Sequence, residues 1–507
     1  MVMGGETEYA ISGRDRAGQV VPQGILLSSL MRHAIETMGY ASSSQRGRFL
    51  KNGGLLYLDA GLHMEWATPE CTSPFDVVRY LAAGDRILLG LSRSFRAARD
   101  MPGIFCSRTN VDYLSGTLWA AHESYMHGVD PCVLQNELLP FLASRVIFGA
   151  GGWDSQAAGL RFTMSPRAHF ITRLADRDSQ YVRPLFHTKD EPHSGEGTHR
   201  LHVACGESLS SETANALRFG TTALVVASIE AGQRPARQVA LASPVVALRR
   251  FAAGLDFAAC SAADPARRLT ALDIQRHYLS CVERLLDGPA MPLWAGRLCA
   301  LWRQTLENLE PGGDGAGRSL DWAIKRQVFE RCIERRGLNW ATLRVWNVAL
   351  KRLKSAWVPA EHGGTFDLRL ALECPSSLRP QRASLDQYLH PHGLSWRGLL
   401  TLAELRDELW EIDARFGALD EGGVFNALDA AGVLDHRLAG LDVEDAVVRP
   451  PQDTRANIRG RVIERLAAAG TSYGAEWTSI YDNERRARLD LMDPFETEER
   501  WSQAAPC

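Results

Sequence analysis

Two segments near the beginning of the chain combine strand-like sequence with an unusual number of carboxylates. Glu6 and Glu8 lie in the first segment, and Asp59, Glu65 and Glu70 lie in or beside the second. Residues two apart in a strand point to the same face of a sheet, so Glu6 and Glu8 share one. Acids gathered on a sheet face repel one another unless cations lie among them. Carboxylates on a rigid sheet suit Mg²⁺, which usually binds together with a nucleotide's phosphates, so the sequence predicts a metal–nucleotide site on a sheet.

The overall composition narrows the class of protein and its partners. A chain of 507 residues is long enough for two or three domains, or for one large catalytic domain with a smaller appendage. The net charge of −3 and the lack of a long basic stripe argue against a nucleic-acid partner. No apolar run is long enough to cross a bilayer, and the ten cysteines are scattered without a C-x-x-C pair. We therefore expect a cytoplasmic protein with reduced cysteines and no membrane contact.

Strand and helix signals divide the chain into regions of different character. They alternate through the first third, whereas residues 271–415 have a mainly helical pattern. Within that region, residues 365–391 lack clear periodicity and contain prolines, so we expect an irregular surface excursion there. A proline pair later precedes a helical pattern at 454–469 and a strand pattern at 473–480. Several strands with long helices between and after them indicate an α+β fold whose antiparallel-rich sheet bears the site.

The candidate acids differ in how strongly their local sequence favours a functional role. Glu6 and Glu8 have no obvious basic neighbour, which favours metal ligands over exposed strand residues. Asp59 ends an apolar strand, where aspartate is disfavoured. It either forms a turn with Gly61, or serves as a general base or metal ligand, and the local sequence leaves both readings open.

A second polar region lies between residues 188 and 202. Lys189, His193 and Arg200 could together bind phosphoryl oxygens, or the segment could be an ordinary exposed loop. The His122–Glu123 pair means little alone, because residue 126 is Met and no H-E-x-x-H zinc motif exists. The chain also lacks a P-loop, a dinucleotide fingerprint and a G-x-S-x-G elbow, and no cysteine has the context of a nucleophile.

Ordered sequence blocks extend from about residue 4 to residue 494. They include Gly5-Glu-Thr-Glu-Tyr9, Leu56-Tyr-Leu-Asp59 with Glu65 and Glu70-Cys71, His122-Glu-Ser-Tyr125, Thr188-Lys-Asp-Glu-Pro-His193, Arg200-Leu-His-Val203, Gly220-Thr-Thr-Ala-Leu224, Leu272-Asp-Ile-Gln-Arg276, Asp321-Trp322 and Asp453-Thr-Arg455. In this order they resemble the Pup ligase and depupylase family, relatives of glutamine synthetase and glutamate–cysteine ligase. The resemblance implies a glutamine synthetase-like domain over residues 1–430, with a curved antiparallel sheet packed on helices, and a small C-terminal domain over 431–507.

The resemblance also implies ATP and Mg²⁺ in the cradle of that sheet. By position, Glu6, Tyr57 and Glu65 resemble the metal-site residues, Asp59 the catalytic base, and Thr68 and Trp477 the residues that contact ATP. Other expected neighbours of the site are Glu8, His122, Glu123, Lys189, His193, Arg200, His202 and Arg455, of which Arg200 and Arg455 are assigned to the cofactor.

The activity implied by the resemblance is isopeptide ligation. ATP would phosphorylate the γ-carboxylate of a C-terminal Glu on a Pup-like modifier, which would then be joined to a lysine of a target protein. Only a short stretch, residues 39–50, stands where the depupylase has a long insert, and this favours the ligase branch. A depupylase-like amide hydrolase, a ligase for small-molecule or peptide acids, and a non-catalytic binding protein are the alternatives.

Three departures from the family pattern bear on these alternatives. Leu55 stands where the family has an arginine that contacts ATP, and leucine cannot donate to phosphate. His187 and Lys189 replace an asparagine and an arginine, and lysine offers a point charge in place of a bidentate fork. Residues 107–109, Ser-Arg-Thr, replace a Lys-Asn-Asn pattern. These changes are consistent with altered nucleotide binding, a different acyl substrate or lost activity.

Overall fold

A computed structural model describes residues 1–38, 47–99, 101, 103–178, 182–264, 266–310, 315–362, 364, 366–373 and 378–503. Of the short stretch at 39–50, residues 39–46 lie outside the described residues. None of the described helices is both long enough and apolar enough to cross a bilayer.

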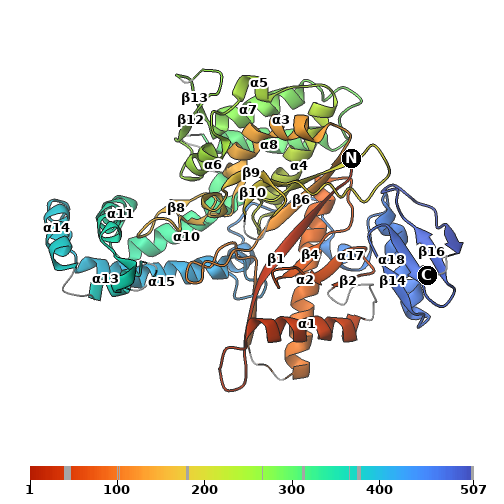
Figure 1. Cartoon of the computed structure of the whole chain (residues 1–507), viewed down its shortest axis with the longest axis horizontal. Coiled ribbons are helices and arrows are strands. Elements are labelled where there is room, and N and C mark those ends of the chain that lie inside the picture. Colours follow the sequence, from red (N-terminus) through yellow and green to blue (C-terminus); the bar gives the residue numbers. More distant parts are fainter. Residues whose placement is uncertain are drawn as a thin grey trace.

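Nine strands of the described residues form the main sheet, which runs through the middle of the molecule (Figure 1). They are β1 (Met3–Arg14), β2 (Gly47–Phe49), β3 (Leu55–Leu58), β4 (Met64–Ala67), β5 (Gly103–Ser107), β6 (Ala121–His127), β9 (Arg173–Asp176), β10 (Pro184–His187) and β11 (His199–Val203). Their order is β2-β3-β4-β1-β6-β11-β10-β9, and β5 pairs with the second half of β1. Every pair is antiparallel except β9 with β10. The predicted α+β fold with an antiparallel-rich sheet is confirmed.

Helices cover one face of this sheet. Of these, α2 (Pro74–Arg99) and α4 (Glu212–Glu230) pack directly on the strands. Behind them, α3 (Pro131–Ser144), α7 (Ala271–Glu283) and α8 (Ala295–Asn308) pack against α4. Two glycines allow close packing: a Cβ on Gly5 of β1 would lie 2.6 Å from the Phe219 ring of α4, and one on Gly84 of α2 would lie 2.2 Å from Trp66. Because side chains alternate along a strand, the residues next to Gly5 and Trp66 face the other way, and these include Glu6 and Glu65.

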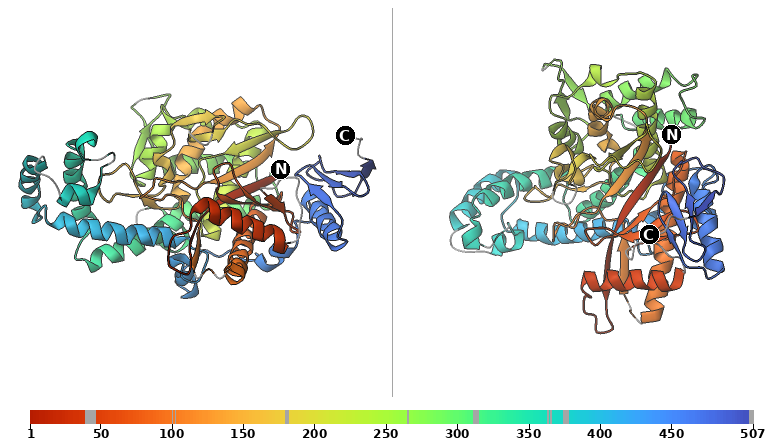
Figure 2. Two further views of the ribbon diagram at one scale, coloured as in Figure 1. Left: turned by 60° about the horizontal axis from the view of Figure 1, so that its bottom comes forward. Right: turned by 45° about the vertical axis from the view of Figure 1, so that its right-hand side comes forward.

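A helical arm projects from the body at the end opposite the C-terminal sheet (Figures 1 and 2). It consists of α10 (Asp321–Arg335), α11 (Trp340–Ser355), α12 (Pro359–His362), α13 (Leu368–Glu373), α14 (Arg379–Leu389) and α15 (Gly398–Phe416). The irregular excursion expected at 365–391 is wrong, because α13 and α14 lie within it. Their apolar residues, among them Leu372 and Leu385, are buried in the arm's own core, and Pro380 occupies the first turn of α14, where proline is tolerated.

The C-terminal segment packs against the β2–β3 edge of the main sheet. Helix α18 (Arg455–Ala468) covers a small antiparallel sheet of β14 (Tyr473–Ala475), β15 (Ser479–Asp482), β16 (Ala487–Asp490) and β17 (Trp501–Gln503). Its apolar core includes Ile458 and Ile480 and continues into Phe49 and Leu55 of the main sheet. The domain boundary at residue 430 stays a prediction.

The remaining elements cover the edges of these units. They are α1 (Gln23–Met38), η1 (Arg145–Phe148), β7 (Gly152–Trp153), β8 (Phe162–Thr163), η2 (Arg167–His169), α5 (Ala236–Val239), α6 (Pro244–Ala252), β12 (Ala258–Cys260), β13 (Arg268–Thr270), α9 (Ala316–Ser319), η4 (His390–His392), α16 (Val424–Ala430) and α17 (Val443–Val448).

Candidate active site

A row of acidic side chains crosses three strands on the sheet face that the helices leave free. Glu8 of β1 lies directly opposite Glu65 of β4, and Glu65 lies opposite Tyr57 of β3. Glu6 precedes Glu8 by two residues and shares its face. Glu8 and Glu65 are buried, with only 8% and 4% of their surfaces exposed. We call Glu6, Glu8, Glu65 and Tyr57 the acid row.

The charged side chains that act most strongly on Glu65 are themselves acidic. Burial raises the pKa of Glu65, and the charges of Glu6 and Glu8 raise it further, to well above its usual value. The hydrogen bond with Tyr57 opposes this rise only in part. Burial and the charge of Glu65 likewise raise the pKa of the Tyr57 phenol. A divalent cation among these oxygens would remove the imbalance, so the donor set fits Mg²⁺.

Glu6 joins the acid row to basic side chains on β6 and β11. Its two carboxylate oxygens lie 3.3 Å from His122 Nδ1 and 3.2 Å from Arg200 Nη2. Burial alone would raise the pKa of Glu6, but His122, Arg200 and His202 outweigh it and lower the pKa below its usual value. Burial and the charge of Arg200 lower the pKa of His202, which leaves its imidazole neutral. Ligand atoms of Glu6, His122 and His202 lie within 4.8 Å of one another, a spacing that suits a shared cation.

Asp59 begins the tight turn between β3 and β4. Its backbone N–H donates to the His63 carbonyl at 3.0 Å, and its Oδ1 accepts from the His63 backbone N–H at 2.5 Å. Burial alone would raise the pKa of Asp59, but its contacts with His63 lower it, so the carboxylate is ionised at neutral pH. Burial would lower the pKa of the His63 ring, but Asp59 and Glu8 raise it to about 9. The structure thus shows the turn, one of the two readings that the sequence left open, and the turn keeps the Asp59 carboxylate charged.

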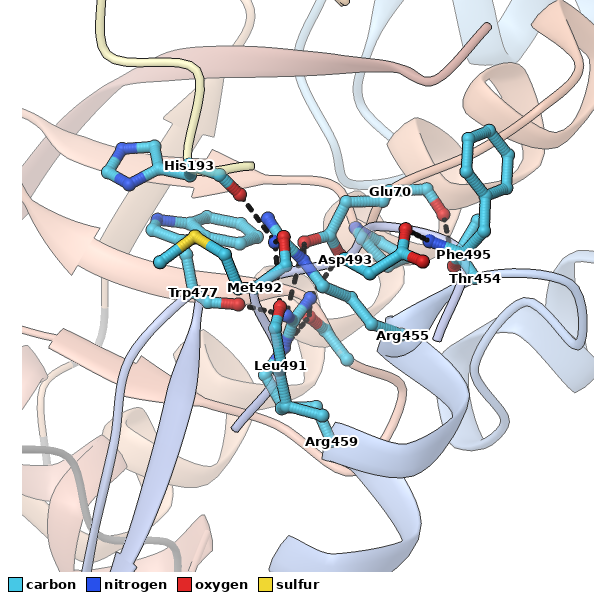
Figure 3. Close-up of polar contacts among 12 residues, drawn as sticks. Glu70, His193, Thr454, Arg455, Arg459, Trp477, Leu491, Met492, Asp493 and Phe495 are labelled. Carbon is cyan, nitrogen blue, oxygen red and sulfur yellow. Dashed lines mark hydrogen bonds and ion pairs between the residues drawn. The ribbon is translucent and has the colours of Figure 1, made fainter. Parts of the chain in front are cut away.

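Glu70 lies at the junction of the sheet with the C-terminal segment, where Arg455 and Arg459 of α18 converge on it (Figure 3). Arg455 Nε donates to Glu70 Oε1 at 2.7 Å, and Arg459 forms an ion pair with Glu70 Oε2. Arg455 Nη1 also donates to the carbonyls of His193, Leu491 and Met492. These contacts join the β10–β11 loop, the sheet and the C-terminal segment.

A cavity of about 130 Å³ opens between the sheet and this junction. Its lining includes Glu6 and Thr68 from the sheet, Arg200 from β11, and Arg455 and Trp477 from the C-terminal segment. Thr68 Oγ1 accepts the Gly5 N–H at 3.1 Å, and the Trp477 ring packs edge-on against Phe49 with 4.9 Å between ring centroids. An aromatic ring, arginines and the end of the acid row around one opening suit a ligand with a flat apolar part and an anionic part.

The structure does not bring every expected neighbour into the site. Glu123 points to the helix-covered face, where Arg145 contacts both of its oxygens at 2.6 and 2.7 Å. It is fully buried and part of the core, so the expectation that it borders the site is wrong. Lys189 is half exposed and lies 4.0 Å from Glu191. Leu55 packs into the cluster that holds Phe49 and Trp477.

Two residues important to the site's geometry did not emerge from the sequence. His63 contacts Asp59. The sequence feature that could have indicated this contact is their separation by four residues across the β3–β4 turn. Arg459 lies one helical turn after Arg455, so both point to the same side of α18. Its guanidinium lies 4.9 Å from the centre of the Trp477 ring.

Comparison with known proteins gives one consistent family. A family model described as "Pup-ligase protein" matches residues 1–354 and 382–481. The Pup–protein ligase of Sanguibacter keddieii is 29% identical over 98% of this chain and 96% of its own, and that of Rhodococcus erythropolis is 30% identical over 97% and 96%. The crystal structure of the ligase PafA with the prokaryotic ubiquitin-like protein Pup has a TM-score of 0.73 at 23% identity, covering 98% of this chain and 90% of that one. PafA in complex with ADP has a TM-score of 0.68 at 23% identity, covering 94% and 92%.

Proposed function

This chain belongs to the Pup-ligase family, and we propose that it is an ATP-dependent ligase that joins a Pup-like modifier to lysines of target proteins. The modifier's C-terminal Glu would supply the carboxylate for the isopeptide bond. Relatives named Pup–protein ligase and fold neighbours bound to Pup and to ADP support this proposal. The observation that carries it is the acid row, lying on the sheet face beside a cavity lined by Trp477 and Arg200.

The proposed reaction has two steps. An oxygen of the γ-carboxylate attacks the γ-phosphorus of ATP, and ADP leaves, which converts a poor electrophile into an acyl phosphate. The lysine nitrogen then attacks the acyl carbon and phosphate leaves. A free lysine amine is protonated at neutral pH, with a pKa of about 10.4, so this attack needs a base. Asp59 is ionised and one-fifth exposed, and we assign it that role.

We assign the metal to the acid row. Glu6, Tyr57 and Glu65 would hold Mg²⁺, and Glu8 borders them. When bound, Mg²⁺ would neutralise charge on the phosphoryl group that is transferred. The raised pKa of Glu65 supports the assignment, since it marks a carboxylate whose surroundings lack a cation.

We assign the nucleotide to the cavity. Trp477 offers an aromatic surface, Thr68 lies on the sheet side, and Arg200 extends from β11 towards Glu6. Arg455 also lines the cavity, but Glu70 and three carbonyls hold its guanidinium. Arg455 would therefore shape the cavity wall and contribute positive charge to it, without a direct hydrogen bond to the nucleotide.

The cysteines support a reducing compartment for this reaction. All eight cysteines among the described residues are free, as expected for a protein of the cytoplasm. The proposed partners there are the modifier and lysine-bearing proteins, with no role for nucleic acid or membrane.

Hydroxylamine trapping tests the proposal directly. The purified chain would be incubated with Mg·ATP, hydroxylamine and one of three acids: a Glu-ending Pup-like polypeptide, the same polypeptide lacking its last residue, or free glutamate. We expect hydroxamate and ADP in equal amounts with the Glu-ending polypeptide only. A lysine-bearing protein in place of hydroxylamine should then give an ATP-dependent conjugate.

The other outcomes favour the alternatives. Hydroxamate from free glutamate would point to a small-molecule ligase. Release of modifier from a preformed conjugate, without ligation, would point to an amide hydrolase. If the chain formed neither hydroxamate nor free modifier and did not bind ATP, that result would contradict enzymatic activity of this kind.

A further inference from the structure

The ring of His63 lies between two carboxylates of the candidate site. His63 Nδ1 is 3.3 Å from Glu8 Oε2 and 3.5 Å from Asp59 Oδ2. His63 Nδ1 is buried and has no partner with the angle of a directed hydrogen bond among the described residues, so these two carboxylate oxygens are its polar contacts. The imidazole separates the acid row from Asp59, and each carboxylate has one oxygen turned towards it.

The β3–β4 turn fixes His63 relative to Asp59. The Leu62 N–H donates to the Asp59 carbonyl at 3.2 Å, and the His63 N–H donates to Asp59 Oδ1 at 2.5 Å. Leu62 adopts a left-handed conformation with φ of 61°, which costs a non-glycine residue about 1 kcal/mol. Backbone strain of this kind persists where surrounding contacts hold it. Here those contacts bring the His63 ring back towards the Asp59 carboxylate.

Trp119 and Ala120 hold the other sides of this arrangement. The Trp119 ring lies 5.9 Å from the His63 ring, centroid to centroid, and is itself buried. Its carbonyl accepts from Arg167 Nη1 at 2.7 Å, which fixes the segment before β6. The Ala120 N–H donates to Glu8 Oε2 at 2.7 Å, so the second carboxylate is also fixed. The ring therefore has buried or anchored groups on several sides, and Asp59 is the more exposed of the two carboxylates that it contacts.

From this geometry we propose that His63 is a positioning residue for the base Asp59, an inference that rests on the proposed function. The His63 ring holds Asp59 Oδ2 in place while the backbone holds Oδ1, so the carboxylate keeps one orientation for the incoming lysine. Without the ring, Asp59 Oδ2 would lose this side-chain contact, and the Glu8 and Asp59 carboxylates would no longer be kept apart. Asp59 would then rotate away from Glu8, because it is the residue at the more open edge.

The two steps of the reaction separate this role from a merely structural one. Acyl-phosphate formation, trapped by hydroxylamine, does not need a base for the nucleophile, because hydroxylamine is largely unprotonated at neutral pH. Transfer to lysine does need one. The experiment therefore measures hydroxamate and lysine conjugate for the wild type, His63→Leu and His63→Asn. Leucine removes the nitrogen, whereas asparagine keeps an N–H group near the position of Nδ1.

We expect His63→Leu to form hydroxamate within about twofold of the wild-type rate and to lose conjugation about 10- to 100-fold, in kcat rather than in KM. His63→Asn should recover conjugation at least about tenfold over His63→Leu. Equal losses of both products, unchanged conjugation in His63→Leu, or no recovery by asparagine would each overturn the role of His63 while leaving the ligase intact. A wild-type chain that forms neither product would overturn the proposed function, and the role of His63 with it.

Discussion

Glu65 and Glu70 are buried acids only five residues apart, and their surroundings are opposite. Glu70 contacts the guanidinium groups of Arg455 and Arg459, which outweigh the effect of burial and lower its pKa to about 2. Glu65 is buried beside two further acids, and its pKa lies well above the usual value. The first arrangement is complete in itself. The second has acidic neighbours and no matching basic side chain among the described residues, so it would be completed by a bound cation.

Glu123 extends the comparison to the other face of the sheet. There Arg145 contacts both oxygens of Glu123, and Tyr125 donates a further hydrogen bond at 2.7 Å. Glu70 and Glu123, which hold elements together, are thus matched by arginines. On the free sheet face Glu65 is not matched, although Arg200 contacts its neighbour Glu6. The difference separates carboxylates that stabilise the fold from Glu65, which is expected to bind a metal.

The largest effect expected from altering the acids of the candidate site is that of Asp59→Asn. It should lower conjugation to lysine by about 10²- to 10⁴-fold, because asparagine cannot accept the amine's proton. ATP binding and hydroxamate formation should stay close to wild type. Rates of both reactions, measured on the same preparation, check this. Unimpaired conjugation would remove Asp59 from the role of base.

Removing an arginine partner of a matched acid should lower the free energy of unfolding. Arg459→Met leaves part of the Glu70 charge buried without its partner, which should cost about 3–5 kcal/mol of unfolding free energy. Arg465→Met is the matched control on the same helix, because Arg465 is exposed where it pairs with Glu499 and should contribute less than about 1 kcal/mol. Urea unfolding of the three proteins measures both values. Equal small losses would show that Glu70 does not depend on its arginines.

The pairing of Glu70 with Arg459 also predicts that the free energy of unfolding depends on pH in the acid range. The folded-state pKa of Glu70 is about 2, below its ordinary value of 4.5, so its contribution is complete above pH 4.5 and is lost as the pH falls towards 2. The wild type should lose up to about 3 kcal/mol over that range through this group. Arg459→Met should lose less, since Arg459 is the first of the charges that lower the pKa. Urea titrations at several pH values would reveal parallel losses if the pair contributed nothing.

The smallest expected effect is a gain in stability, whereas the preceding variants lose stability or activity. Glu65→Gln removes a charge whose raised pKa makes the folded protein less stable as the pH rises above 4.5. In metal-free buffer near neutral pH, it should therefore stabilise the fold by about 1 kcal/mol. Glu123→Gln, at a matched acid, should destabilise it. Thermal unfolding of both variants distinguishes the two classes, and destabilisation by Glu65→Gln would contradict the proposed imbalance.

Local sequence was sufficient where the structure depends on neighbours in the chain. Strand alternation placed Glu6 and Glu8 on one face, and the position of Asp59 at the end of a strand gave a turn as one of two open readings. The same alternation puts Glu123 out of phase with His122, but which face the helices would cover depends on α2 and α4. In the arm, the prolines suggested irregular chain, although proline at the start of a helix is compatible with α14.

Contacts between distant residues could not be predicted from local pattern. Glu70 pairs with arginines that follow it by 385 and 389 residues. Trp477 reaches the cavity only because α18 and β14 pack on Phe49 and Leu55. A single sequence contains no record of such pairings, so Glu70 and Glu65 look alike in it. Only the folded chain shows that one is matched and the other is not.

The most direct test of this distinction is the response of thermal stability to Mg²⁺ without nucleotide. The midpoint of unfolding would be measured for the wild type, Glu65→Gln and the control Arg465→Met across a Mg²⁺ titration at constant ionic strength. If the acid row binds the cation, the wild type and the control rise with Mg²⁺, and Glu65→Gln rises much less. An equal rise in all three, or none in the wild type, would contradict the assignment of the metal to the acid row.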